Sequence, residues 1–210
     1  MIVPPAEARP FDAVLCDLDN VIRSYDMSRV AALERSAGLA EGTTAGVAYA
    51  PEVDLPLLLG RIGTAEWEAS IVRGLEGRVP EPRARELAAA FAHAPFHADE
   101  AVVALLRRIR ELMPLVLVTN ATLRLDSDLA ALGLADLAHH VVGSAHVGVA
   151  KPDPAIYAIA VERAAVPARR CLFVDDRAEN VEAARALGMT SMLFREPTDL
   201  RRALAPALGE

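Results

Sequence analysis

Short apolar runs and helical segments alternate along most of this chain. Five runs rich in Val and Leu predict buried strands at 13–16, 115–118, 141–142 with their neighbours, 171–174 and 191–194. Between and after them, the segments 99–112, 154–165 and 179–187 have apolar residues at helical spacing or the Pro and Gly positions typical of helix ends. The alternation predicts an α/β fold in which helices cover both faces of a Rossmann-like parallel sheet.

One long segment, from about residue 26 to residue 96, interrupts this alternation. It contains helical patterns at 28–37, 64–75 and 81–92, joined by turns with Gly and Pro, and no run in it predicts a buried strand. We therefore interpret 26–96 as a helical domain inserted after the first strand. The sheet-containing core then consists of 1–25 and 97–210.

Composition narrows the class of protein. The 210 residues suit one large domain or one domain with an insertion, and 53% hydrophobic residues supply a substantial core. A net charge of −7 without any run of Lys and Arg argues against a nucleic-acid partner. No apolar run has the length of a membrane span, and the first residues lack the pattern of a signal peptide. We expect a cytoplasmic protein of unknown oligomeric state, with Cys16 and Cys171 as small buried side chains.

The chain's positive charges are unusual, because only one of its 22 basic residues is a lysine. That residue, Lys151, follows the third predicted strand across a loop. A compact ammonium on a flexible stem can enter a narrow anion site that a planar guanidinium does not fit. The single lysine therefore indicates a position with a specific requirement.

Polar residues follow four of the five predicted strands. The set consists of Asp17 and Asp19, then Thr119 and Asn120, then Lys151, and finally Asp175 and Asp176. Ligands of parallel α/β sheets bind at the carboxyl ends of the strands, where all of these residues are expected to meet. Each group alone could be an ordinary turn or helix cap, but the set in this order predicts a functional site.

The stretch "CDLDNVI" raises a chemical question, because Asp17 and Asp19 stand two positions apart after a buried strand. If the extended backbone continues, both side chains point to the same side. Two anions held that close repel each other unless a cation lies between them or one keeps its proton. The spacing therefore indicates a metal, a shared proton, or both.

Four motifs in this sequence resemble those of the haloacid dehalogenase superfamily of aspartate-nucleophile hydrolases. They are "DLDNVI", "LVLVTN", "GVAKPDPAIY" and "FVDDRAENVEAARALGM", in the family's order and over nearly the whole chain. The helical segment 26–96 matches the position of the family's cap domain. Asn20 stands where many relatives have Gly, and Asn is compatible with the tight turn expected there.

The resemblance implies catalytic roles that suit the chemistry of the residues. Asp17 is the expected nucleophile, which would form an aspartyl-phosphate, and Asp19 is the expected acid and base. Thr119, Lys151 and the backbone N–H of Asn120 are expected to bind the phosphoryl oxygens.

The same resemblance implies a Mg²⁺ cofactor, because an anionic nucleophile must approach an anionic phosphate. The expected ligands are Asp17, the backbone carbonyl of Asp19, Asp176, and Asp175 either directly or through water. Hard oxygen ligands of this kind suit Mg²⁺ better than zinc.

The expected function is a Mg²⁺-dependent phosphatase for a small phosphorylated metabolite, with sugar phosphates as one candidate class. Asp19 favours phosphoryl transfer over the metal-independent dehalogenation of 2-haloacids, because the dehalogenases generally lack this second aspartate. A phosphomutase would keep the same core residues and stays open as an alternative. An alternative of another class is a non-catalytic binding protein on the same fold.

Overall fold

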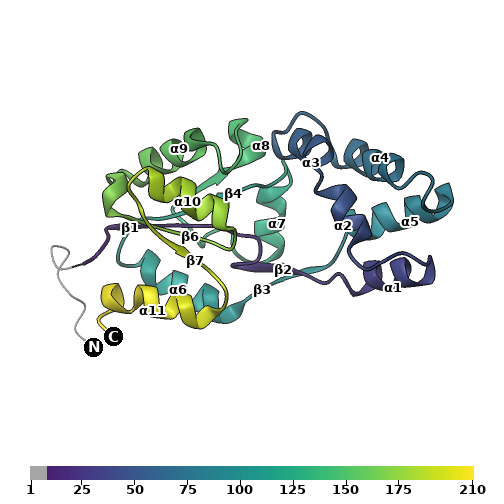
Figure 1. The fold of residues 1–210 in the computed structure, drawn as a ribbon. Helices are drawn as coiled ribbons and strands as arrows, with labels where there is room; N and C mark the ends of the chain where they lie inside the picture. Colours follow the sequence, from purple (N-terminus) through teal and green to yellow (C-terminus); the bar gives the residue numbers. More distant parts are fainter. Residues whose placement is uncertain (1–8) are drawn as a thin grey trace. The chain divides into compact units, whose positions relative to one another are not determined.

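A computed structural model of the protein describes residues 9–210 (Figure 1). The first eight residues of the predicted core segment 1–25 lie outside the described residues. The chain divides into two compact units. We call them the sheet unit, which comprises the described residues up to Ser24 together with Ala98–Glu210, and the helical unit, Tyr25–His97.

A five-stranded parallel sheet forms the centre of the sheet unit (Figure 1). Its strands are β1 (Ala13–Cys16), β4 (Leu115–Thr119), β5 (His140–Gly143), β6 (Cys171–Asp175) and β7 (Thr190–Leu193), in the order β5-β4-β1-β6-β7. Every neighbouring pair is parallel, which confirms the predicted α/β fold with a parallel sheet. The first strand lies in the middle of this order, so the residues that follow it have strands on either side.

Helices cover both faces of the sheet. They are α6 (Glu100–Arg110), α7 (Leu125–Ala131), α8 (Ser144–Val147), α9 (Pro154–Ala164), α10 (Ala178–Ala186) and α11 (Pro197–Leu208), with a short 3₁₀ turn at Ala168–Arg170. Figure 1 shows α9 and α10 on one side of the sheet and α6 and α11 on the other. The helices α7, α8 and α11 were not predicted.

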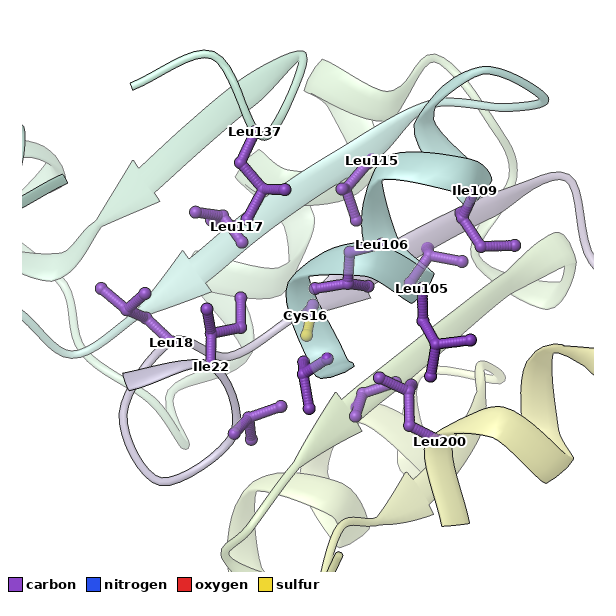
Figure 2. Close-up of a cluster of buried hydrophobic side chains, with 14 of the residues drawn as sticks. Cys16, Leu18, Ile22, Leu105, Leu106, Ile109, Leu115, Leu117, Leu137 and Leu200 are labelled. Carbon is purple, nitrogen blue, oxygen red and sulfur yellow. The ribbon is translucent and has the colours of Figure 1, made fainter. Parts of the chain in front are cut away.

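Strand side chains alternate between two apolar clusters, as the two-residue period of a strand requires. In β1, Val14 and Cys16 belong to the cluster under α6 and α11, whereas Ala13 and Leu15 belong to the cluster under α9. Figure 2 shows the first cluster, which contains Cys16 of β1, leucines of α6 and Leu200 of α11. Burial on both faces explains why the strands read as continuous apolar runs rather than as alternating ones.

The helical unit has an apolar core of its own. Its helices are α1 (Ser28–Ser36), α2 (Thr43–Ala48), α3 (Pro51–Leu58), α4 (Thr64–Gly74) and α5 (Glu81–Ala92). Trp67 of α4 packs against Phe91 of α5, with ring centroids 5.9 Å apart. The buried carboxylate of Glu34 accepts the backbone N–H groups of Gly42 and Thr44, which fixes the start of α2.

Two short strands, β2 (Arg23–Tyr25) and β3 (Phe96–Ala98), pair as a separate two-stranded sheet at the points where the chain enters and leaves the helical unit. They contain only three residues each, and the sequence did not predict them. Among residues 9–210, none of the helices combines the length and apolar character that crossing a membrane requires.

Candidate active site

The carboxyl ends of β1, β4 and β6 carry most of the predicted site residues. Asp17 directly follows β1, Thr119 is the last residue of β4, and Asp175 is the last residue of β6. The loop after α8 brings Lys151 between two of them, because its Nζ lies 2.7 Å from Asp17 Oδ1 and 2.7 Å from Asp175 Oδ2. The structure thus brings together residues separated by more than 150 positions in the sequence.

Asp17 is held at the end of β1 by its backbone and by its carboxylate. Its N–H donates to the carbonyl of Val174 in β6, and its Oδ1 accepts the N–H of Leu18 at 2.7 Å. Burial, opposed by the ammonium of Lys151 and reinforced by the nearby Asp175, raises the pKa of Asp17 to about 7. The N–H of Leu18 and the ammonium of Lys151 both contact Oδ1, which leaves Oδ2 for a ligand.

Lys151 is fixed at both ends. Its backbone N–H donates to Asn120 Oδ1 at 2.8 Å, and its carbonyl accepts from Asn120 Nδ2 at 3.0 Å. The side chain is buried, which lowers the pKa of its ammonium, but the carboxylates of Asp17 and Asp175 outweigh burial and raise the pKa overall. Asn120 therefore connects the loop after β4 to the loop that carries the lysine, through its side chain, whereas the sequence had indicated only its backbone N–H.

Asp175 is completely buried, and protein donors surround its carboxylate. Lys151 and Asn180 donate to Oδ2, and Asn180 and the N–H of Arg177 donate to Oδ1. These bonds orient Asp175 towards the lysine. Asp175 was expected to bind the metal either directly or through water. These hydrogen bonds suit the indirect role better than direct ligation.

Three carboxylates lie close enough to hold a metal ion. Oxygen atoms of Asp17, Asp175 and Asp176 all lie within 4.8 Å of one another. Asp176 is partly buried, which raises its pKa, while a hydrogen bond of 3.1 Å from Asn20 Nδ2 acts in the opposite direction. If all three carboxylates are ionised, the one ammonium of Lys151 leaves an excess of two negative charges, and a divalent cation with oxygen ligands fits that balance.

The turn after Asp17 has the conformation that its sequence indicated. Asn20 adopts a positive φ of 59°, and its N–H donates to the carbonyl of Arg23 at 2.8 Å. Asn is one of the few residues other than Gly that accept this conformation at low cost. The turn directs the side chain of Asn20 to Asp176.

Asp19 lies on this same turn, but its carboxylate is not among the clustered oxygens. Its two oxygens accept two hydrogen bonds from Arg23, at 2.6 Å from Nε and 3.1 Å from Nη2. This agrees with the expectation that Asp19 contributes its backbone carbonyl, and not its side chain, to a metal site. Its carboxylate is partly exposed and can reach a ligand or water.

Thr119 presents a hydroxyl with no partner. Its Oγ1 is buried, and it has no hydrogen bond among the residues that the structure describes. A buried hydroxyl without a partner is costly. Because this one lies at the carboxyl end of a parallel strand, where ligands of such sheets bind, it suits a position completed by a ligand. The loop that follows is secured by Ser144, whose Oγ bonds both the N–H and the carbonyl of Ala121.

Sequence reasoning missed several supporting residues. From the sequence, Arg23 is compatible with either a contact to an anionic substrate or a surface ion pair. The structure instead shows it buried and in contact with both Asp19 and Asp128 of α7. Nothing in a single sequence links Asp128 to Arg23, since the pair is separated by 105 positions. Ser144 was missed for a similar reason, because a serine after a predicted strand has no distinctive spacing.

Comparison with known proteins identifies one family. The family model described as haloacid dehalogenase-like hydrolase matches residues 11–188. Phosphatase MT3486 of Mycobacterium tuberculosis is 43% identical over 65 residues, which cover 31% of this chain and 30% of that protein. The chain thus matches less than a third of the length of this curated relative.

Solved structures resemble this chain over most of its length. An enzyme of this family from Bacteroides thetaiotaomicron, BT-2542, determined with magnesium and inorganic phosphate, has a TM-score of 0.67 at 20% identity, covering 88% of this chain and 94% of that one. An L-2-haloacid dehalogenase from Xanthobacter autotrophicus, with chloropropionic acid covalently bound, has a TM-score of 0.62 at 19% identity, covering 94% and 84%. Both likenesses concern the fold.

Proposed function

This chain belongs to the haloacid dehalogenase-like hydrolases, and from that premise we propose that it is a Mg²⁺-dependent phosphatase that acts on a small phosphorylated metabolite. The observation that carries the proposal is the arrangement around Lys151. One buried ammonium lies between two carboxylates, with a third carboxylate nearby and an unpartnered hydroxyl at the end of β4. This combination suits a phosphoryl group and a divalent cation.

In the first step of the proposed reaction, Asp17 Oδ2 attacks the phosphorus and the bond to the leaving oxygen breaks. Asp19 gives a proton to that oxygen, and the phosphoryl group stays on Asp17 as an acyl phosphate. Lys151 and the hydroxyl of Thr119 stabilise the phosphoryl oxygens, together with the backbone N–H of Asn120.

In the second step, water attacks the phosphorus and the bond to Asp17 Oδ2 breaks. Asp19 takes the proton that water loses, so that both carboxylates return to their starting states. The net reaction converts a phosphate ester and water into an alcohol and inorganic phosphate.

The expected metal ligands are Asp17, Asp176 and the backbone carbonyl of Asp19, with Asp175 acting through its bonds to Lys151 and Asn180. Bound there, Mg²⁺ supplies positive charge that offsets the repulsion between the carboxylates and the phosphate. The magnesium and phosphate present with BT-2542 support this assignment as an analogy of fold.

The helical unit is proposed to act as the cap that selects the substrate. Its five helices lie between β2 and β3 in the sequence and have their own apolar core, so the unit can move as a body. This proposal keeps the small phosphorylated substrate and the cytoplasmic location expected from the sequence.

Hydrolysis of p-nitrophenyl phosphate tests the proposed function. We expect turnover with Mg²⁺, none with EDTA, and a loss of about a thousandfold or more in Asp17→Asn. A 2-haloacid serves as the alternative substrate in the same assays. Halide release without metal, together with no phosphate release from a panel of phosphate esters, would overturn the phosphatase in favour of a dehalogenase.

A further inference from the structure

Arg23 is a buried arginine beside the proposed active site, with 3% of its side chain exposed. Its guanidinium contacts two carboxylates from different elements. Nε and Nη2 donate to the two oxygens of Asp19 at 2.6 and 3.1 Å, and Nη1 donates to Asp128 Oδ2 at 3.0 Å. Burying a charge is costly unless it is paired and hydrogen-bonded, and here both conditions are met.

The backbone of the turn places Arg23 beside Asp19. The N–H groups of Ile22 and Arg23 both donate to the carbonyl of Leu18 at 2.8 Å, and the N–H of Asn20 donates to the carbonyl of Arg23. These bonds close the chain between residues 18 and 23 into one compact turn. The two-pronged contact with Asp19 follows from this local geometry.

Asp128 gives the arginine a second attachment point outside the turn. It lies on α7, the helix that follows β4 in the sequence after a short loop. The loop between β4 and α7 starts at Asn120, directly after Thr119, the last residue of β4. The contacts from Asp19 through Arg23 to Asp128 therefore connect the turn after β1 with the segment that carries the proposed phosphate-binding residues.

We propose that Arg23 is a positioning residue for Asp19, anchored by Asp128. The inference rests on the proposed function, in which Asp19 transfers the proton. A carboxylate at 31% exposure would otherwise rotate about its side-chain bonds, and a planar guanidinium that bonds both oxygens fixes its plane as well as its position. All three guanidinium nitrogens of Arg23 donate to Asp19 or Asp128, so we assign Arg23 a role that acts through Asp19.

The geometry makes a specific demand on the residue type. A lysine at position 23 would keep the positive charge but has no planar pair of donors for the two oxygens of Asp19. Arg23→Lys therefore removes the orientation and keeps the charge. Asp128→Asn is the second variant, because it weakens the anchor without changing the turn.

The chain provides a matched control in Arg170. Its Nε and Nη2 also donate to two oxygens of one carboxylate, Asp12, at 2.8 and 2.7 Å. Asp12 precedes β1 and Arg170 precedes β6, so this pair lies at the amino ends of the strands, opposite the proposed site. Arg170→Lys changes the same type of contact and is expected to leave kcat and KM unchanged.

The test is a double-mutant cycle on the hydrolysis of p-nitrophenyl phosphate with Mg²⁺. We expect Arg23→Lys to lower kcat by about ten- to a hundredfold with little change in KM, since general acid–base catalysis contributes roughly 10²–10⁴-fold. Asp128→Asn is expected to lower kcat in the same direction by a smaller factor. In an Asp19→Ala background, Arg23→Lys should cause no further loss, because the residue that it orients is absent.

The outcomes distinguish the inference from the proposed function. An unchanged kcat in Arg23→Lys, or an equal loss with and without Asp19, would overturn the positioning role while the phosphatase stands. If Arg23→Lys does not fold, an unchanged kcat in Asp128→Asn overturns the role instead. No metal-dependent turnover by the wild type on any phosphate ester would overturn the proposed function, and the inference would be rejected with it.

Discussion

At the scale of single residues, the site is defined by groups whose protein environment is unfavourable until a ligand is present. Thr119 has a buried hydroxyl without a partner, and Asp17 is a buried carboxylate beside two others. Such features lower the stability of a folded protein, and they are typical of functional positions. The positions of Thr119 and Asp17 could be predicted from the sequence, because both come at the ends of apolar runs. The residues that surround them in the fold could not be predicted.

Replacement of Thr119 by valine tests the hydroxyl. The change keeps the shape and removes a polar atom without a hydrogen bond, so the free energy of unfolding should stay within about 1 kcal/mol of the wild type or rise. Activity should fall about ten- to a hundredfold, because one donor to the phosphoryl group is lost.

Thr44→Val is the matched control for this change, since the hydroxyl of Thr44 in α2 is also buried and has no hydrogen bond within residues 9–210. It should have a similar effect on denaturant unfolding and leave phosphate release unchanged. A marked loss of stability in Thr119→Val, with activity intact, would contradict the ligand-binding role of Thr119.

The raised pKa of Asp17, about 7, predicts a pH dependence of stability in the protein without metal. The folded protein binds this proton more tightly than the unfolded chain does, so the neutral form stabilises the fold at low pH. That contribution is lost as the pH rises from about 4 to about 7, with a slope of at most about 1.4 kcal/mol per pH unit.

Urea unfolding of the wild type and of Asp17→Asn across this pH range measures the effect as a difference. The wild type should lose stability relative to the variant as the pH rises. Parallel curves for the two proteins, with EDTA present, would show that burial does not raise the pKa of Asp17.

At the scale of elements, the long and periodic segments were predictable and the short ones were not. The prediction 81–92 coincides with α5, and 13–16 with β1, because continuous apolar runs and amphipathic faces span them. The helix α3 was missed since Pro56 lies inside it, and Pro206 similarly obscured α11. Leu200, Leu204 and Leu208 at four-residue spacing were nevertheless a signal for α11.

The contact between the loops after β4 and α8 gives an element-scale prediction. Asn120→Ala removes two hydrogen bonds to the backbone of Lys151 and should lower the free energy of unfolding by about 1–2 kcal/mol. Because the lysine's loop loses its attachment, kcat should also fall, by about tenfold.

Asp99→Ala is the matched control, since Asp99 caps α6 by accepting two backbone N–H groups, from Ala101 and Val102. It should cost about 1 kcal/mol of stability and leave kcat unchanged. Equal kinetic effects in the two variants would mean that Asn120 acts only through stability.

At the scale of the whole molecule, the fold follows from where the helical segment is inserted. The chain forms β1 and the turn with Asp17 and Asp19, continues through the helical unit, and then completes the sheet around β1. The order of the motifs in the sequence made the parallel sheet and its edge predictable. Contacts such as Arg23 with Asp128 depend on the packing of side chains distant in sequence, which no local pattern contains.

The most direct test of the proposed mechanism is to trap the phosphoryl group on Asp17. Wild type, Asp19→Ala and Asp17→Asn would be mixed with p-nitrophenyl phosphate and Mg²⁺, quenched in acid after a fraction of a turnover, and analysed by peptide mass. We expect one phosphoryl group on the peptide containing Asp17, more of it in Asp19→Ala because hydrolysis of the intermediate needs a base, and none in Asp17→Asn. Turnover by the wild type without any phosphorylated peptide in Asp19→Ala, or with the phosphoryl group on another residue, would show that Asp17 is not the nucleophile.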